Sequence, residues 1–188
     1  GVAIGTEAAL GGTVFYALHS ILVMTALYIA AGMAAKMCGG AEDMTKIRGI
    51  YQKNTLLAAI TLMLFFAVAG LPPFSGFWPK LMLVKASIEG APWWAPFSIL
   101  LTGFLTTIAV GRVWALSYWK PADEGSEDKN EKTALAVSDL VPLVGLTIIV
   151  VGVGLFPQTV FELAYQAAEQ LVNPTAYIES VFGSEVVE

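Results

Sequence analysis

Long apolar runs separated by short polar segments dominate the chain. Four of these runs are long enough to cross the hydrocarbon core of a bilayer as a helix, which takes about 20 residues. They cover approximately residues 14–35, 54–85, 92–119 and 141–157. Soluble cores do not repeat such runs four times. The pattern therefore predicts an all-α integral membrane protein with four transmembrane helices.

Composition supports the membrane prediction and excludes other classes of protein. Hydrophobic residues make up 56% of the chain and charged residues 13%, whereas soluble domains carry roughly a quarter charged residues. The net charge of −5 argues against nucleic acid as a partner, because phosphates require a basic face. The single cysteine, Cys38, cannot by itself form an intramolecular disulfide or a cysteine cluster for zinc. We expect no metal site and no cofactor, and no motif for nucleophilic catalysis is evident.

Lysine and arginine residues gather in two loops that two helices separate, so both loops lie on the same side of the membrane. The opposite side carries no lysine or arginine except Lys85, at the membrane boundary. By the positive-inside rule, the basic loops are cytoplasmic and both chain ends are extracytoplasmic in the cell (inner) membrane. The loop cations are Lys36, Lys46, Arg48 and Lys53, and then Lys120, Lys129 and Lys132.

The segment after the fourth apolar run is amphipathic. Apolar residues between positions 159 and 172 fall on one helical face, and polar residues lie elsewhere. This pattern predicts a helix on the outer membrane surface or against a neighbouring subunit.

We therefore divide the chain into a membrane part, residues 1–157, and an extracytoplasmic segment and tail, residues 158–188. The chain opens at Gly1 with no signal peptide, and we expect it to be part of a longer protein.

Glycine and proline residues interrupt the second apolar run. The two adjacent prolines remove two amide donors and force the preceding residue out of the helical region, which breaks the helix at Leu71-Pro72-Pro73. Freed carbonyls cannot face lipid, so the break must lie against protein or water. Interrupted helices of this kind form ion sites in transporters because their half-helix ends present oriented dipoles. The candidate break residues are Gly70, Leu71, Pro72, Pro73, Ser75 and Gly76.

Lys80 follows the break and is the first candidate for carrying protons. Burying its ammonium ion costs roughly 3 kcal/mol on insertion scales, so the side chain is a candidate to lose its proton near physiological pH. In the alternative interpretation, Lys80 extends to the outer headgroups. Lys85 lies five residues later, where a membrane anchor is expected.

His19 is the second candidate, in an otherwise charge-free helix. An imidazole changes its charge near neutral pH and passes a proton between its two nitrogens. The alternative is a neutral histidine that bonds to a backbone carbonyl of a neighbouring helix. The residues alone leave both interpretations open.

Three segments together resemble one known family. The run from Gly70 to Lys80 is similar to the broken-helix region of the antiporter-like subunits, which Mrp-type multisubunit sodium/proton antiporters share with respiratory complex I. Residues 5–32 and 111–119 resemble the helices before and after that region. The resemblance covers nearly the whole chain up to Pro157 and favours the D-type subunit of the Mrp antiporter.

The resemblance implies that the chain holds the last four membrane helices of a longer subunit, with both ends outside. It also implies that Lys80 is the broken-helix lysine, a proposed terminal element of the family's proton path, and that His19 belongs to the polar stretch before it. Many members carry a lysine a few residues after that histidine, where this chain has Met24. The family's essential glutamate–lysine pair belongs to earlier helices, so we expect this part not to transport alone.

We therefore expect a membrane subunit of a multisubunit cation/proton antiporter rather than an enzyme, with Lys80 and His19 in its proton path. Its expected partners are other subunits of the complex, lipid, protons and monovalent cations, Na⁺ above all. One alternative is a proton-translocating subunit of a complex I-like NADH–quinone oxidoreductase or a membrane hydrogenase. Another is a non-conducting scaffold subunit, which Met24 in place of the lysine would favour.

Overall fold

The computed structural model describes residues 1–41, 43, 46–121, 135–173, 175, 178 and 181. Within these residues all regular structure is helical, which confirms the all-α prediction. In the described part of the chain, three helices are long and apolar enough to cross a membrane, Glu7–Met37, Trp94–Trp119 and Ser138–Leu155. The loop cations Lys129 and Lys132 lie outside the described residues, as does most of the tail after Asn173.

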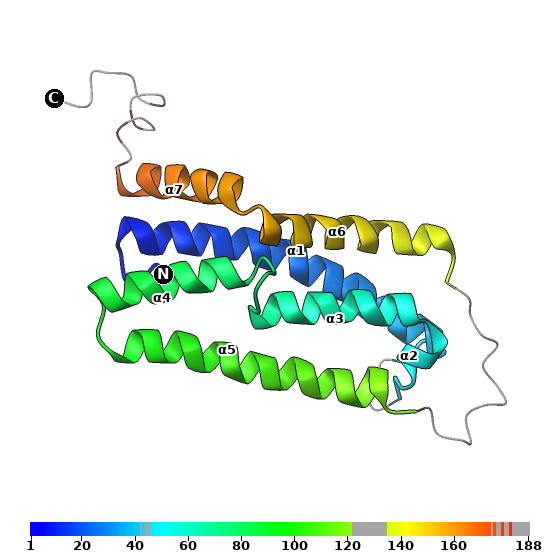
Figure 1. Cartoon of the computed structure of the whole chain (residues 1–188). Coiled ribbons are helices and arrows are strands. Elements are labelled where there is room, and N and C mark those ends of the chain that lie inside the picture. Colours follow the sequence, from blue (N-terminus) through cyan, green and yellow to red (C-terminus); the bar gives the residue numbers. More distant parts are fainter. Residues whose placement is uncertain are drawn as a thin grey trace.

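The helices run side by side in one bundle (Figure 1). In chain order they are α1 (Glu7–Met37), α2 (Ile50–Lys53), α3 (Thr55–Ala69), α4 (Phe77–Gly90), α5 (Trp94–Val113), the π-helix η1 (Trp114–Trp119), α6 (Val137–Leu155) and α7 (Gln158–Val172). Figure 1 shows the end of α1, α2, the end of the α5–η1 helix and the start of α6 at one end of the bundle. The two loops that were predicted to share a side therefore both start and finish at this one end of the bundle. We call it the basic end. Which side of a membrane this end faces stays a prediction.

An ion pair closes the basic end of the bundle. Lys36 Nζ, in the last turn of α1, lies 2.9 Å from Asp139 Oδ2, in the first turn of α6. Both side chains are largely accessible to solvent, where such pairs contribute about 0–1 kcal/mol. The pair links two helices that are more than 100 residues apart in sequence.

Two helix ends differ most from the sequence prediction. α1 begins at Glu7 rather than near Val14, because the Thr6 side chain accepts a hydrogen bond of 3.3 Å from the amide of Ala9 and caps the first turn. α4 continues through Gly90, although the sequence predicted an end near Lys85. Burial of Ala86 and Ser87 holds this last turn on the bundle.

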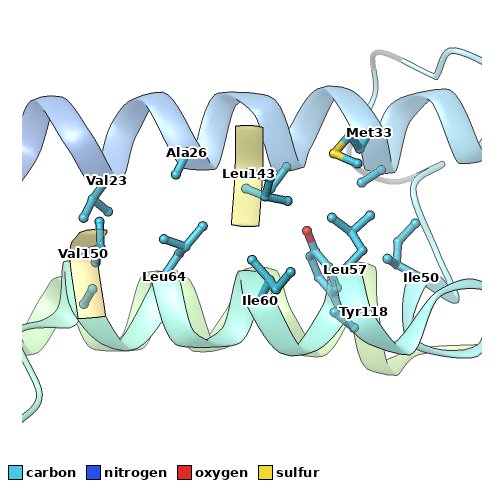
Figure 2. Packing of buried hydrophobic residues seen from close by; sticks show 14 residues of the cluster. Val23, Ala26, Met33, Ile50, Leu57, Ile60, Leu64, Tyr118, Leu143 and Val150 are labelled. Carbon is cyan, nitrogen blue, oxygen red and sulfur yellow. The ribbon is translucent and has the colours of Figure 1, made fainter. Parts of the chain in front are cut away.

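The largest hydrophobic cluster joins α1, α3 and α6 in the half of the bundle near the basic end. Figure 2 shows Val23 of α1, Leu64 of α3, and Leu143 and Val150 of α6 directed into a common core, and all four are fully or almost fully buried. Tyr118 of η1 also enters this cluster. The core therefore holds the half of the bundle next to the basic end, and the break between α3 and α4 lies beyond it.

α7 covers α1 of the same chain. Phe161 packs edge-on against Phe15 with ring centroids 5.3 Å apart, and Ala164 and Ala168 are fully buried. A Cβ added at Gly11 would meet the Ala164 carbonyl at 3.6 Å, so small residues bring the two helices close. The amphipathic helix is present as predicted. Phe161, Ala164 and Ala168 of its apolar face pack within this chain, whereas Leu171 is 62% exposed. Contact of this helix with the membrane surface or a neighbouring subunit stays a prediction.

Candidate functional site

The candidate site lies where the chain stops being helical between α3 and α4. α3 ends at Ala69, and Gly70 adopts the left-handed conformation with φ +82°, which favours glycine. The amides of Gly70 and Leu71 each donate to the carbonyl of Phe66 at 3.1 Å. The chain turns through residues 70–76, where the Pro72–Pro73 peptide bond is cis, before α4 begins at Phe77. We call residues 70–76 the break.

The side chain of Lys80 reaches back into the break from the first turn of α4. Its Nζ donates hydrogen bonds to the carbonyls of Val68, at 2.8 Å, and Ala69, at 2.7 Å. Carbonyls in the last turn of a helix have no partner within that helix, and they form the negative end of its dipole. The ammonium group therefore caps α3 and does not extend to the outer end of α4. Lys85 is the exposed lysine on that helix.

His19 contacts the break from the middle of α1. The side chain is 4% exposed, and its Nδ1 lies 2.9 Å from Oγ of the buried Ser75. Its partner is thus a hydroxyl of the break. The alternative interpretation had predicted a backbone carbonyl instead. A Cβ added at Gly76 would meet His19 Nε2 at 2.9 Å and would collide with the carbonyl oxygen of Ala67. Glycine at this position lets the imidazole and the end of α3 approach the break closely.

Lys80 and His19 both lie against the glycines of the break. A Cβ added at Gly70 would lie 2.9 Å from Lys80 Nζ, just as one at Gly76 would meet His19 Nε2. Three segments, α1, the break and α4, bring two protonatable side chains and the Ser75 hydroxyl together. This arrangement can hold a proton and transfer it.

α6 closes over the break. The indole nitrogen of Trp78 donates a 2.8 Å hydrogen bond to the Gly154 carbonyl. A Cβ added at Gly154 would collide with the carbonyl oxygen of Pro73 and would lie 2.7 Å from the amide nitrogen of Ser75. Sequence reasoning did not single out Gly154. A glycine inside an apolar helix often marks close packing between helices, so its position was the available signal.

The remaining predicted residues lie at the edge of this site. The side chains of Leu71, Pro72 and Pro73 are exposed in the chain. Met24 is 46% exposed, and thus lies on a different face of α1 from the buried His19. Among the residues that the structure describes, no group of three or more histidine, cysteine, aspartate or glutamate side chains could hold a metal ion.

The family follows from comparison with known proteins. A family model described as NADH:quinone oxidoreductase/Mrp antiporter, TM, matches residues 1–106. The chain belongs to this family. Among its curated members, the Na⁺/H⁺ antiporter D subunit of Alkalihalophilus pseudofirmus is 32% identical over 181 residues, which cover 96% of this chain and 36% of the relative. The chain thus spans little more than a third of that relative's length. The resemblance inferred from residues 70–80 is confirmed.

Two solved structures share the fold. A chain of the Mrp complex from a Dietzia species matches with a TM-score of 0.83 and 24% identity, over 97% of this chain and 41% of that one. A chain of the membrane-bound sulfane sulfur reductase, an archaeal respiratory membrane complex, matches with a TM-score of 0.75 and 19% identity, over 91% of this chain and 34% of that one. Family membership and the apolar helices together make the chain a multi-pass membrane protein.

Proposed function

We propose that the chain is part of the membrane subunit of a multisubunit cation/proton antiporter, with Na⁺ as the cation. In this proposal α3 and α4 are the two halves of one broken crossing, so that residues 1–157 cross the cell membrane four times. The basic end faces the cytoplasm, and residues 158–188 lie on the extracytoplasmic side with both chain ends. The name of the 32% identical relative, a Na⁺/H⁺ antiporter D subunit, supports the proposal. Other subunits of the complex would supply the remaining partners.

The observation that carries this proposal is the contact of Lys80 with the end of α3. A protonated Lys80 is stabilised by the Val68 and Ala69 carbonyls, and it loses this charge–dipole attraction when it releases its proton. His19 and Ser75 meet at the same break and would provide the acceptor. A proton would pass between Lys80 and His19 through the Ser75 hydroxyl or an internal water molecule. The two groups would thus form one end of a proton path that earlier helices of the subunit continue.

Two other functions fit the family, and one observation bears on each. A redox-driven proton pump is suggested by the respiratory relative, but that match is 19% identical and supports the shared fold alone. A non-conducting scaffold was inferred from Met24. The exposed position of Met24 leaves the contacts of His19, Ser75 and Lys80 unchanged, so this substitution does not argue against conduction at the break.

The function is tested with the full-length subunit and its partner subunits in inverted membrane vesicles that hold a proton gradient. Adding Na⁺ should dissipate the gradient, as followed by a pH-sensitive dye. Proton movement that is independent of Na⁺ and requires an electron donor would instead support the redox-driven alternative. Absence of both activities in a fully assembled complex would support the scaffold.

Replacing Ser75 with alanine should slow Na⁺-dependent proton movement by about fivefold. This factor corresponds to the loss of one hydrogen bond of about 1 kcal/mol, which leaves His19 Nδ1 without its partner. The initial rate after Na⁺ addition is the measurement. Thr25→Ala is the matched control, because the Thr25 hydroxyl is exposed and bonds only to the Ile21 carbonyl of its own helix. Equal rates for Ser75→Ala and wild type would contradict a role of the His19–Ser75 contact.

A further inference from the structure

One buried hydroxyl remains without a partner in the part of the chain that the structure describes. Ser117 of η1 is 3% exposed, and its Oγ has no hydrogen-bond partner. A buried hydroxyl that makes no hydrogen bond is costly, and internal water molecules commonly supply the missing bond. The Ser117 hydroxyl is therefore a place where a water molecule is expected.

Two more buried hydroxyls form a contact between η1 and α3, and one of them belongs to the residue that follows Ser117. Tyr118 Oη donates a 3.3 Å hydrogen bond to Oγ1 of Thr61, and Thr61 in turn donates to the Leu57 carbonyl at 2.8 Å. Figure 2 shows the ring of Tyr118 beside Leu57 with its oxygen directed into the core. We call Thr61, Ser117 and Tyr118 the hydroxyl cluster. All three side chains are buried, and Tyr118 belongs to the hydrophobic core.

The two consecutive buried side chains Ser117 and Tyr118 lie in the π-helix. In η1 the amide of Lys120 donates to the carbonyl of Ala115, five residues earlier, at 3.1 Å. Leu116 and Trp119, on either side of the buried pair, are exposed. Short π-helices are rare and occur frequently at functional sites.

Aromatic contacts hold the phenol of Tyr118 in place. Its ring stacks on Trp114 with centroids 4.7 Å apart and an angle of 7° between the planes. On another side it meets Phe65 edge-on at 6.2 Å. The ring is therefore fixed by packing, and the Thr61 hydrogen bond is not required to position it. This separates the chemistry of the hydroxyl from the packing of the ring.

The hydroxyl cluster lies between Lys80 and the basic end of the bundle. Thr61 and Val68 are seven residues apart on α3, which places them on one face about 10 Å apart along the axis. Val68 is a hydrogen-bond partner of Lys80. On α5, a Cβ added at Gly103 would lie 4.0 Å from Lys80 Nζ. α5 continues into η1 as one helix, Trp94–Trp119. This helix and α3 therefore carry the cluster at one point and flank the ammonium group at another.

We propose that the hydroxyl cluster is a buried water site that transfers protons between the basic end of the bundle and Lys80. The inference rests on the proposed function, and it adds residues on the side of Lys80 that faces the basic end. In each transfer a hydroxyl accepts a proton from a water molecule on one side and releases its own proton to the other side. One O–H bond forms as another breaks, and no oxidant is needed. Transfer over the remaining two turns of α3 would require transient internal water.

The test compares variants that remove a hydroxyl and keep the side-chain shape. Thr61→Val, Tyr118→Phe and Ser117→Ala in the full-length subunit, assembled with its partners, should each slow Na⁺-dependent proton movement several-fold. Thr61→Ser retains a hydroxyl and should keep most of the wild-type rate. Thr107→Val is the control, because the Thr107 hydroxyl is exposed and bonds to the Gly103 carbonyl of its own helix.

Two readouts separate proton transfer from packing and from the proposed function itself. Loss of rate should occur at an unchanged melting temperature of the complex, and a high-resolution map should show a water molecule within hydrogen-bond distance of Ser117. Wild-type rates in all three variants, or a dry Ser117, would overturn the water site. If Lys80→Ala abolishes exchange in the same assay, the proposed function still stands. If Lys80→Ala also leaves the rate unchanged, the proposed function fails independently.

Discussion

Replacing Lys80 with alanine in the full-length, assembled subunit should lower Na⁺-dependent proton movement by about 10²-fold, the size typical for removal of a positioned proton donor. Lys80 is the only lysine of the described residues that donates to both unpaired carbonyls at the end of α3. Without it, His19 loses the protonatable neighbour with which it would exchange a proton. The initial rate of proton movement in inverted vesicles, normalised to assembled complex, measures the effect.

A second substitution distinguishes proton transfer from capping of α3. Lys80→Arg keeps a cation with several donors for the Val68 and Ala69 carbonyls, but an arginine does not release its proton in a protein. We expect Lys80→Arg to assemble normally and to lose exchange like Lys80→Ala. The control is Lys85→Ala on the same helix, whose side chain is exposed. Full activity of Lys80→Arg would show that Lys80 only caps the helix and would contradict its place in the proton path.

Gly154→Ala should destabilise the assembled subunit by about 1–3 kcal/mol, as overpacking typically does. The added methyl group would collide with the Pro73 carbonyl oxygen and would lie 2.7 Å from the Ser75 amide nitrogen. Both are backbone atoms that cannot turn aside, so α6 must move away from the break and weaken the Trp78 hydrogen bond to the Gly154 carbonyl. Thermal unfolding of the purified complex, followed by tryptophan fluorescence, measures the loss.

Gly152→Ala provides the matched control two residues earlier on α6. A Cβ added there meets no atom within 4 Å, and alanine forms helices better than glycine by about 1 kcal/mol. We expect this variant to unfold at the wild-type temperature or slightly above it. Because Ser75 also contacts His19, Gly154→Ala should slow proton movement more than Gly152→Ala does. Equal stability of the two variants would show that α6 does not constrain the break.

The sequence predicted those features that depend on local chemistry. Apolar length determines whether a helix can cross a membrane, so the long helices were found, with errors mainly at their ends. The end of α3 followed from the Pro72–Pro73 pair, since a proline beyond the first turn of a helix removes an amide donor and clashes with the carbonyl four residues earlier. The extra turn of α4 was missed because burial of Ala86 and Ser87 on the bundle stabilises it, and no local signal records that burial.

The candidate site shows the same difference between features that the sequence predicted and features that depend on tertiary packing. By themselves, the residues identified Lys80 and His19, because a lysine or a histidine in an apolar run is costly and therefore conspicuous. Their partners were decided by the tertiary structure. The His19 contact joins residues 56 positions apart, and the orientation of Lys80 towards the end of α3 depends on how the chain turns through the break. Packing between distant helices, of α6 on the break and of η1 on α3, sets these contacts. In the sequence, such packing is indicated only by a single glycine or hydroxyl residue.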